Sequence, residues 1–248
     1  MKHSFLTRPG FTLVEMLTVI AIIGILVALV AGAMVAVRPR VQKAMIDAEI
    51  KQLEMALEAY KAQYGEYPPD GTDATAVKRH LAKAYPRATN LNVSGINPGN
   101  ALVFWLGGPI KDGRPIGFSK KPTNPDFTGS DTTTPRTTPL FEFNPAQFGT
   151  VSGNFATYTA KTGGAPYVYF KAKISGGTSS YSGSYNADGE NITAYKKGSV
   201  WYGEKKFQIL SPGLDGKYGI GGDINTAVKN VNAFDNQTNF GSIDELAD

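Results

Sequence analysis

The feature that most constrains this chain is an apolar run near its start. Between residues 11 and 37 the polar side chains are Thr12, Glu15 and Thr18 alone. Residues 16–37 would form about 33 Å of helix, which is enough to cross the hydrocarbon core of a bilayer. A helix buried in a soluble core rarely stays apolar on every face over such a length. The run therefore predicts a membrane-spanning helix.

A cleaved secretory signal is an alternative explanation of the same run. Lys2 and Arg8 would form its basic region, and Ala31-Gly32-Ala33 would be its cleavage site, leaving Met34 first. Against it, the apolar region of such a signal is usually only about 7 to 15 residues long, and Glu15 would fall near its start. Basic residues lie on both sides of the run, so charge counting does not settle its orientation.

The helical pattern continues beyond the apolar run. Up to residue 64, apolar residues recur at steps of mostly three and four, with charged residues on the other side. Gly65, followed closely by two prolines, predicts the end of the helix. We expect one helix, apolar all round over 11–37 and amphipathic over 38–64. Its predicted stripe is Val41, Met45, Ala48, Leu53, Ala56, Leu57, Tyr60 and Tyr64, and Tyr60, Tyr64 and Tyr67 are expected to seat the helix against the rest of the chain.

A carboxylate inside this run needs a partner. A lone charge within a bilayer costs on the order of 3 kcal/mol. A cut before Phe11 would create a positively charged α-amino group four residues from Glu15. In a bundle of such helices, that amine could reach Glu15 of a neighbouring subunit, and the pairing would fix the axial register.

These residues resemble the N-terminal signal of type IV pilins and of the pseudopilins of type II secretion. The shared pattern is a short basic leader that ends in Gly10, followed by Phe11, Glu15 and an apolar helix. The resemblance implies cleavage of the leader, residues 1–10, by prepilin peptidase and N-methylation of Phe11. It also implies that Glu15 functions in subunit addition and that the fold is pilin-like.

Residues 65–248 are expected to form a β-rich head. Alternation over residues 165–174 predicts a half-exposed strand, and SVWYGEKKFQIL (199–210) predicts another. The predicted fold class is α+β, with the long helix, transmembrane in its first half, packed against a small antiparallel sheet.

The segment 68–160 looks like an insertion that enlarges this head. A short helix is predicted at 77–85, and a buried strand or helix segment at 101–108. The stretch from Lys121 to Pro139 is rich in Pro, Thr, Asp and Gly and is expected to be an exposed loop.

The loop SPGLDGKYGIGGD, residues 211–223, is a candidate metal site. Its glycines would allow a tight turn that folds Asp215, Asp223 and several carbonyls around one centre. Calcium prefers six to eight oxygen ligands of this mixed kind. A glycine-rich turn with two solvated aspartates is the alternative. The loop is similar to the calcium-binding loop of the major pseudopilin, the G-type subunit, which implies Asp215 and Asp223 as ligands. Asp235 and Asp244, further along the chain, are additional candidates for a ligand or a cap.

The composition argues against several other functions. Lys+Arg 25 against Asp+Glu 21 gives +4, too weak a bias to indicate nucleic-acid binding. Cysteine is absent, so disulfides and thiolate chemistry are excluded. His3 and His80 are the two histidines, which argues against a histidine-based triad or metal centre. We expect His80 on the surface of a short helix, and no enzymatic activity.

The predicted function is that of a structural subunit of a pseudopilus in type II protein secretion. The resemblance implies a single-pass precursor in the bacterial inner membrane with its head in the periplasm. Its implied partners are prepilin peptidase, copies of itself, minor pseudopilins and an inner-membrane assembly platform, with membrane lipid covering the helix before assembly. A type IV pilus subunit for adhesion, motility or DNA uptake is the alternative within the family. A membrane-anchored carbohydrate-binding module is the alternative outside it.

Overall fold

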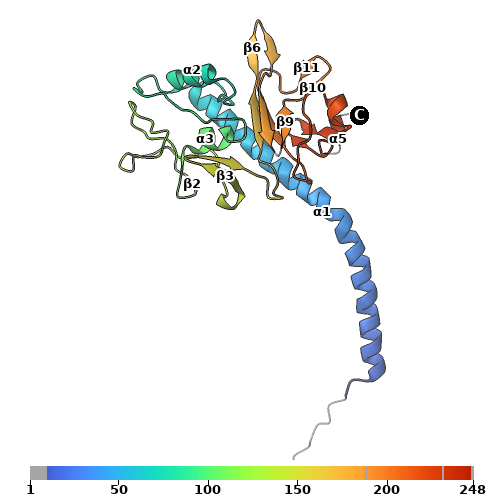
Figure 1. Ribbon diagram of the computed structural model, residues 1–248. Helices are drawn as coiled ribbons and strands as arrows, with labels where there is room; N and C mark the ends of the chain where they lie inside the picture. Colours follow the sequence, from blue (N-terminus) through green and yellow to red (C-terminus); the bar gives the residue numbers. More distant parts are fainter. Residues whose placement is uncertain (1–9, 188, 231, 247–248) are drawn as a thin grey trace, which may run out of the picture. The chain divides into compact units, whose positions relative to one another are not determined.

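The computed structural model describes residues 10–187, 189–230 and 232–246, and only the backbone at residues 33, 35 and 36 (Figure 1). Except for Gly10, the predicted leader 1–10 lies outside the described residues. The chain forms two compact units, Met1–Val41 and Gln42–Asp248.

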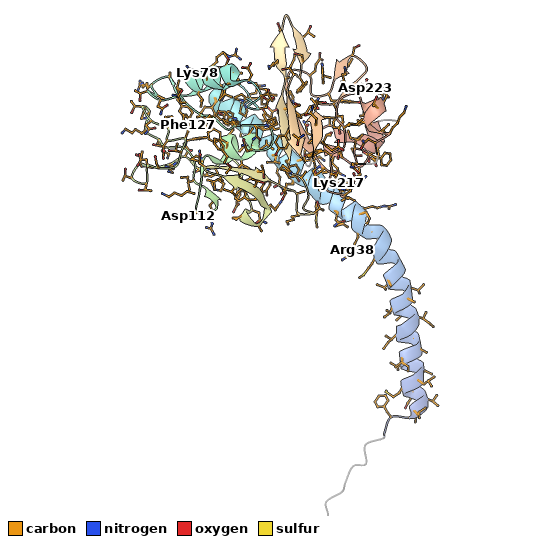
Figure 2. All side chains as sticks on the ribbon, viewed as in Figure 1. Arg38, Lys78, Asp112, Phe127, Lys217 and Asp223 are labelled. Atoms are coloured by element: carbon orange, nitrogen blue, oxygen red, sulfur yellow. The ribbon has the colours of Figure 1, made fainter. Side chains whose placement is uncertain are left out.

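Helix α1 (Leu13–Tyr64) confirms the prediction of one long helix. Its apolar first half exposes its described side chains all round (Figure 2). Pro39 lies within the helix. Gly65 ends it as predicted, because this residue adopts a φ of +79° and its N–H donates to the carbonyl of Lys61 at 2.7 Å.

The buried stripe on the second half of α1 differs in part from the predicted one. Val41, Met45 and Ala48, expected to begin it, are exposed. The chain offers two adjacent apolar rows here, and periodicity alone does not choose between them. The buried row is the one that includes Ile46 and Ile50. Its members are Ile46, Ile50, Leu53, Ala56, Leu57 and Tyr60.

The sheet of the head is antiparallel, in the order β14-β13-β12-β5. Its strands are β5 (Val168–Lys171), β12 (Phe207–Ser211), β13 (Gln237–Thr238) and β14 (Gly241–Ser242). Tyr169 of β5 packs in the core that contains α1, whereas Val168 and Phe170 pack in a second core with C-terminal segments. The predicted strand is confirmed, but its predicted half exposure is wrong for β5 because both faces of the strand are covered.

Hairpins and short helices complete the described part of the head. In Figure 1, β6 stands at the edge of the head. The hairpins are β1 (Ile110–Lys111) with β2 (Arg114–Pro115), β3 (Phe148–Ser152) with β4 (Phe155–Tyr158), β6 (Lys173–Ser175) with β7 (Thr178–Ser180), β8 (Ser184–Ala187) with β9 (Glu190–Thr193), and β10 (Lys196–Lys197) with β11 (Val200–Trp201). The helices after α1 are α2 (Ala74–Ala84), α3 (Ala101–Gly107), the 3₁₀ helix η1 (Pro145–Gln147), α4 (Ile224–Ala227) and α5 (Ile243–Leu246).

The segment 68–160 is more ordered than its composition indicates. Helix α2 confirms the helix predicted at 77–85, and the apolar stretch at 101–108 forms the fully buried helix α3. The loop 121–139 is not exposed throughout, contrary to prediction, because Asp126 is buried within it. The Asp126 carboxylate accepts hydrogen bonds from the loop's own N–H groups and from Arg136, so the loop folds around a paired charge.

His80 is buried, with 2% of its surface exposed, and the prediction of a surface position is wrong. Its Nε2 lies 2.8 Å from the Tyr60 hydroxyl and its Nδ1 lies 2.7 Å from Glu66 Oε1. An ionised carboxylate only accepts, so Nδ1 donates to Glu66 and the neutral ring accepts from Tyr60. Burial lowers the pKa of His80, although Glu66 opposes the shift. Tyr60, buried here, seats α1 in the head as predicted.

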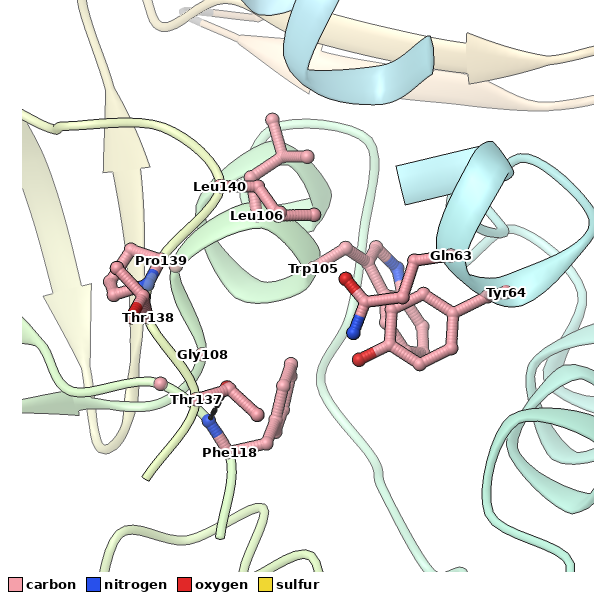
Figure 3. Close-up of a pocket in the computed structure, with 12 residues that line it drawn as sticks. Gln63, Tyr64, Trp105, Leu106, Gly108, Phe118, Thr137, Thr138, Pro139 and Leu140 are labelled. Atoms are coloured by element: carbon pink, nitrogen blue, oxygen red, sulfur yellow. Dashed lines mark hydrogen bonds between the residues drawn. The ribbon is translucent and has the colours of Figure 1, made fainter. Parts of the chain in front are cut away.

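The end of helix α1 meets α3 at Gln63, Tyr64 and Trp105 (Figure 3). Nearby, the N–H of Phe118 donates to Thr137 Oγ1 at 2.9 Å. The cavity between these elements measures about 10 Å³, enough for about one water molecule. The head is therefore closed at this junction, and the candidate sites lie elsewhere.

Candidate functional site

Thr12 and Glu15 form a capping box at the start of α1. Glu15 Oε2 accepts hydrogen bonds from the Thr12 N–H and the Thr12 hydroxyl, both at 2.8 Å. The Glu15 N–H donates in return to Thr12 Oγ1 at 3.2 Å. These bonds satisfy backbone N–H groups that the first turn of a helix leaves without partners. The sequence-based prediction gave Glu15 a role only toward a neighbouring subunit and did not include this cap. The pattern Thr-x-x-Glu ahead of an apolar run is the sequence signal for it.

The capping box leaves part of the Glu15 carboxylate available. Among the described residues, Oε1 has no hydrogen-bond partner, and Glu15 is exposed. Gly10 and Phe11 precede the helix, and Phe11 is 78% exposed. The structure thus presents the predicted cleavage position, the residue predicted to be methylated and the predicted assembly residue together on one unburied segment.

The segment that follows Glu15 is apolar and has no cover within the described chain. Leu13–Gly32 is long and apolar enough to cross a membrane by length and composition. None of its most apolar stretch is buried in the structure. Exposed apolar area of this extent is unfavourable in water, so lipid or other helices must surround it.

A second polar cluster joins the amphipathic half of α1 to the head. Glu49 Oε1 accepts from Gln147 Nε2 at 2.8 Å and from the Tyr158 hydroxyl at 3.1 Å, and Oε2 accepts from the Tyr167 hydroxyl at 2.6 Å. Burial and the nearby Glu49 charge raise the pKa of both tyrosines, so their hydroxyls stay protonated as donors. The sequence did not reveal this cluster, because its partners lie about a hundred residues from Glu49.

The glycine-rich loop brings Asp215 close to Asp235. Asp235 Oδ2 accepts from the N–H groups of Leu214 at 2.7 Å and Asp215 at 3.2 Å. Gly213 adopts a φ of +71°, and an added Cβ there would collide with Asp235. Burial raises the pKa of Asp215, and the charge of Asp235 raises it further. Asp235 Oδ1 is buried and has no hydrogen-bond partner among the described residues.

The other two acids named from the sequence have structural partners. Asp223 caps α4, accepting from the N–H of Asn225 at 3.0 Å, and also accepts from the N–H of Gly198 at 3.1 Å. Asp244 forms an ion pair with Lys43 of α1 at 3.0 Å. Within the described residues, no three His, Cys, Asp or Glu side chains gather as a metal site. A cation in this loop would therefore rely on Asp215 and Asp235 together with backbone carbonyls.

Comparison with known proteins finds a family model that matches the N-terminal segment and a relative that matches about half of the chain. The family model described as the prokaryotic N-terminal methylation motif matches residues 7–31, which include Gly10, Phe11 and Glu15. The type IV major pilin protein PilE1 of Neisseria gonorrhoeae is 32% identical over 147 residues, covering 51% of this chain and 81% of that protein. No solved structure matches the chain.

Proposed function

Because the chain belongs to the type IV pilin family, we propose that it is a structural subunit of a pseudopilus in type II protein secretion. The observation that carries the proposal is the uncovered apolar helix with Glu15 at its start. Such a helix is stable in a bilayer or in a bundle of like helices. The subunit's role is therefore assembly rather than catalysis.

Processing supplies the partner for Glu15. Prepilin peptidase cuts between Gly10 and Phe11, and the new α-amino group of Phe11 pairs with the free Oε1 of Glu15 in the preceding subunit. Pairing of opposite charges in an apolar bundle sets the stagger between neighbouring helices, because any other register leaves a charge uncompensated. Oε2 meanwhile keeps its hydrogen bonds to Thr12.

Extraction from the membrane exchanges one apolar surrounding for another. Lipid covers the helix in the inner membrane, and neighbouring helices cover it in the filament, so the change in apolar burial is small. An assembly ATPase acting through an inner-membrane platform then drives the transfer, with the head in the periplasm and minor pseudopilins in the same filament.

A type IV pilus subunit for adhesion, motility or DNA uptake is the second candidate, favoured by the likeness to a major pilin. The glycine-rich loop with its paired aspartates favours the pseudopilus. Deleting the gene separates the two. We expect exported proteins to accumulate in the periplasm of the deletion strain. Normal secretion combined with loss of surface filaments would instead assign the chain to a pilus.

We also propose that the loop 211–223 binds calcium. The buried, unpartnered Asp235 Oδ1 and the neighbouring Asp215 fit an oxygen-seeking cation, and calcium would neutralise their mutual repulsion. Asp223 would have to exchange its capping bonds for the ion.

The calcium site is tested on the full chain in detergent. We expect CaCl₂ to raise the melting temperature of the head, EGTA to reverse the rise, and Asp235→Asn to abolish it. Asp223→Asn tests whether Asp223 is also a ligand. If it is, this variant should lose the rise in melting temperature with CaCl₂, and if it is not, the rise should remain. A melting temperature that is the same in CaCl₂ and EGTA would refute the site.

A further inference from the structure

A cleft of about 430 Å³ lies in the head between α2 and the strands β5 and β6. Its volume is within the range of small-molecule sites. Six of its lining residues are charged, three acidic and three basic: Glu66, Asp70, Asp73, Arg79, Lys171 and Lys173. Which of these six residues already form ion pairs with each other decides the charge of the ligand that the cleft can bind.

The three carboxylates are already satisfied. Asp70 accepts from the N–H groups of Thr72 and Lys171, each at 3.0 Å. Asp73 caps α2 and pairs with Lys173 at 3.7 Å. Glu66 accepts from buried His80 and lies 3.7 Å from the ammonium of Lys83. None of these acids forms an ion pair with Lys171 or Arg79.

Two cations of the cleft, Lys171 and Arg79, are therefore not engaged in a direct ion pair. Within the part of the chain that the structure describes, the side chains of Lys171 and Arg79 have no ion pair and no hydrogen-bond acceptor. Burial lowers the pKa of Lys171, the charges of Glu66 and Asp70 oppose that shift, and the charge of Arg79 adds to it. An anion placed between Lys171 and Arg79 would offset the cost of burying the Lys171 charge and the repulsion between the two cations.

We propose that this cleft binds a small ligand with a carboxylate or phosphate group, held by Lys171 and Arg79. A guanidinium presents paired N–H donors that match either group. Ile174, 58% exposed at the cleft wall, gives the rest of the ligand an apolar surface. The inference concerns the head alone and does not depend on the kind of filament.

The test is titration calorimetry on the full chain in detergent, with inorganic phosphate in one arm and glutarate in the other. Ionic strength is held constant with NaCl, because screening alone would alter weak charge interactions. We expect saturable binding of at least one anion, and a Kd at least about tenfold weaker in Arg79→Gln and Lys171→Gln. Binding in the phosphate arm alone assigns a phosphate ligand, and binding in the glutarate arm alone assigns a carboxylate.

Lys78→Gln is the matched control. Lys78 is exposed on the same helix and does not line the cleft, so this variant removes the same charge and should bind like the wild type. Arg79 is also exposed, so Arg79→Gln decides the matter should Lys171→Gln fail to fold. Absence of binding by both anions up to about 10 mM, or wild-type affinity in Arg79→Gln, would overturn the proposal.

Discussion

Glu15 Oε2 lies 2.8 Å from both the backbone nitrogen and the hydroxyl of Thr12. The capping box and the proposed subunit pairing use different properties of the same carboxylate. Capping needs only an acceptor, whereas pairing with an α-amino group needs a negative charge. A neutral side chain of the same shape therefore separates the two roles.

Glu15→Gln should retain the cap, since glutamine serves at this position of a capping box, but should lose filament assembly. We expect N-terminal sequencing to find Phe11 first in the variant, and electron microscopy to find no filaments. Thr12→Val is the control, because it removes the capping hydroxyl and keeps the charge, and it should still assemble. Filaments of normal amount and stagger from Glu15→Gln would contradict the charge pairing.

Glu49→Ala should destabilise the head by about 3 kcal/mol or more, because it leaves buried donors without an acceptor. Gln147, Tyr158 and Tyr167 would each lose a hydrogen bond to the carboxylate. Urea unfolding of the full chain in detergent, followed by tryptophan fluorescence, measures the change.

Glu54→Ala is the comparison for that experiment. Glu54 lies on the same helix, and no hydrogen bond to its side chain is found in the described residues, so we expect a change of about 0.5 kcal/mol or less. Equal effects of the two substitutions would show that Glu49 contributes nothing beyond helix propensity.

The long helix could be predicted from the sequence because its signals are local. Apolar residues repeat at helical spacing, and Gly65 ends the pattern with the left-handed conformation that glycine favours. The choice of buried row was wrong because Ile46 and Met45 are similarly apolar, and only the packing of the head, which covers Ile46 and leaves Met45 exposed, decides between the two.

The polar interior of the head could not be predicted, because its partners are distant in sequence. His80 is buried by Tyr60 and Glu66, which belong to a different helix and the turn that follows it. Asp126 is one of the acids in the loop, and composition does not indicate which of them will pair with an arginine. The loop acid Asp235, ranked below Asp223 from the sequence, is the one whose carboxylate reaches the N–H of Asp215.

The head should lose stability as the pH falls below about 6.5, because of His80. In the folded state its pKa is lowered from 6.5, so below that pH the unfolded chain binds a proton that the folded chain does not. The slope from one such group is at most about 1.4 kcal/mol per pH unit, and this contribution is constant above the unfolded pKa.

Urea unfolding at several pH values between 7 and 5 tests this dependence on a chain that begins at Phe11 and therefore lacks His3. His80→Gln should be less stable at every pH but should show a flatter profile. Parallel profiles in the two proteins would mean that His80 does not titrate differently on unfolding.

Gly117→Ala should destabilise the head far more than Gly113→Ala. Both glycines have positive φ, +70° and +72°, so each substitution imposes a similar backbone strain of about 1 kcal/mol. A Cβ at Gly113 meets nothing within 4 Å, whereas one at Gly117 would overlap the carbonyl oxygen of Thr137. To avoid that overlap, the two segments joined by the Phe118–Thr137 hydrogen bonds must move apart. This movement should lower the free energy of unfolding by about 2 kcal/mol or more beyond the backbone strain. The difference between the two variants in urea unfolding thus measures the close packing of the 68–160 segment. Equal losses would mean that this segment accommodates the methyl group and is looser than its hydrogen bonds indicate.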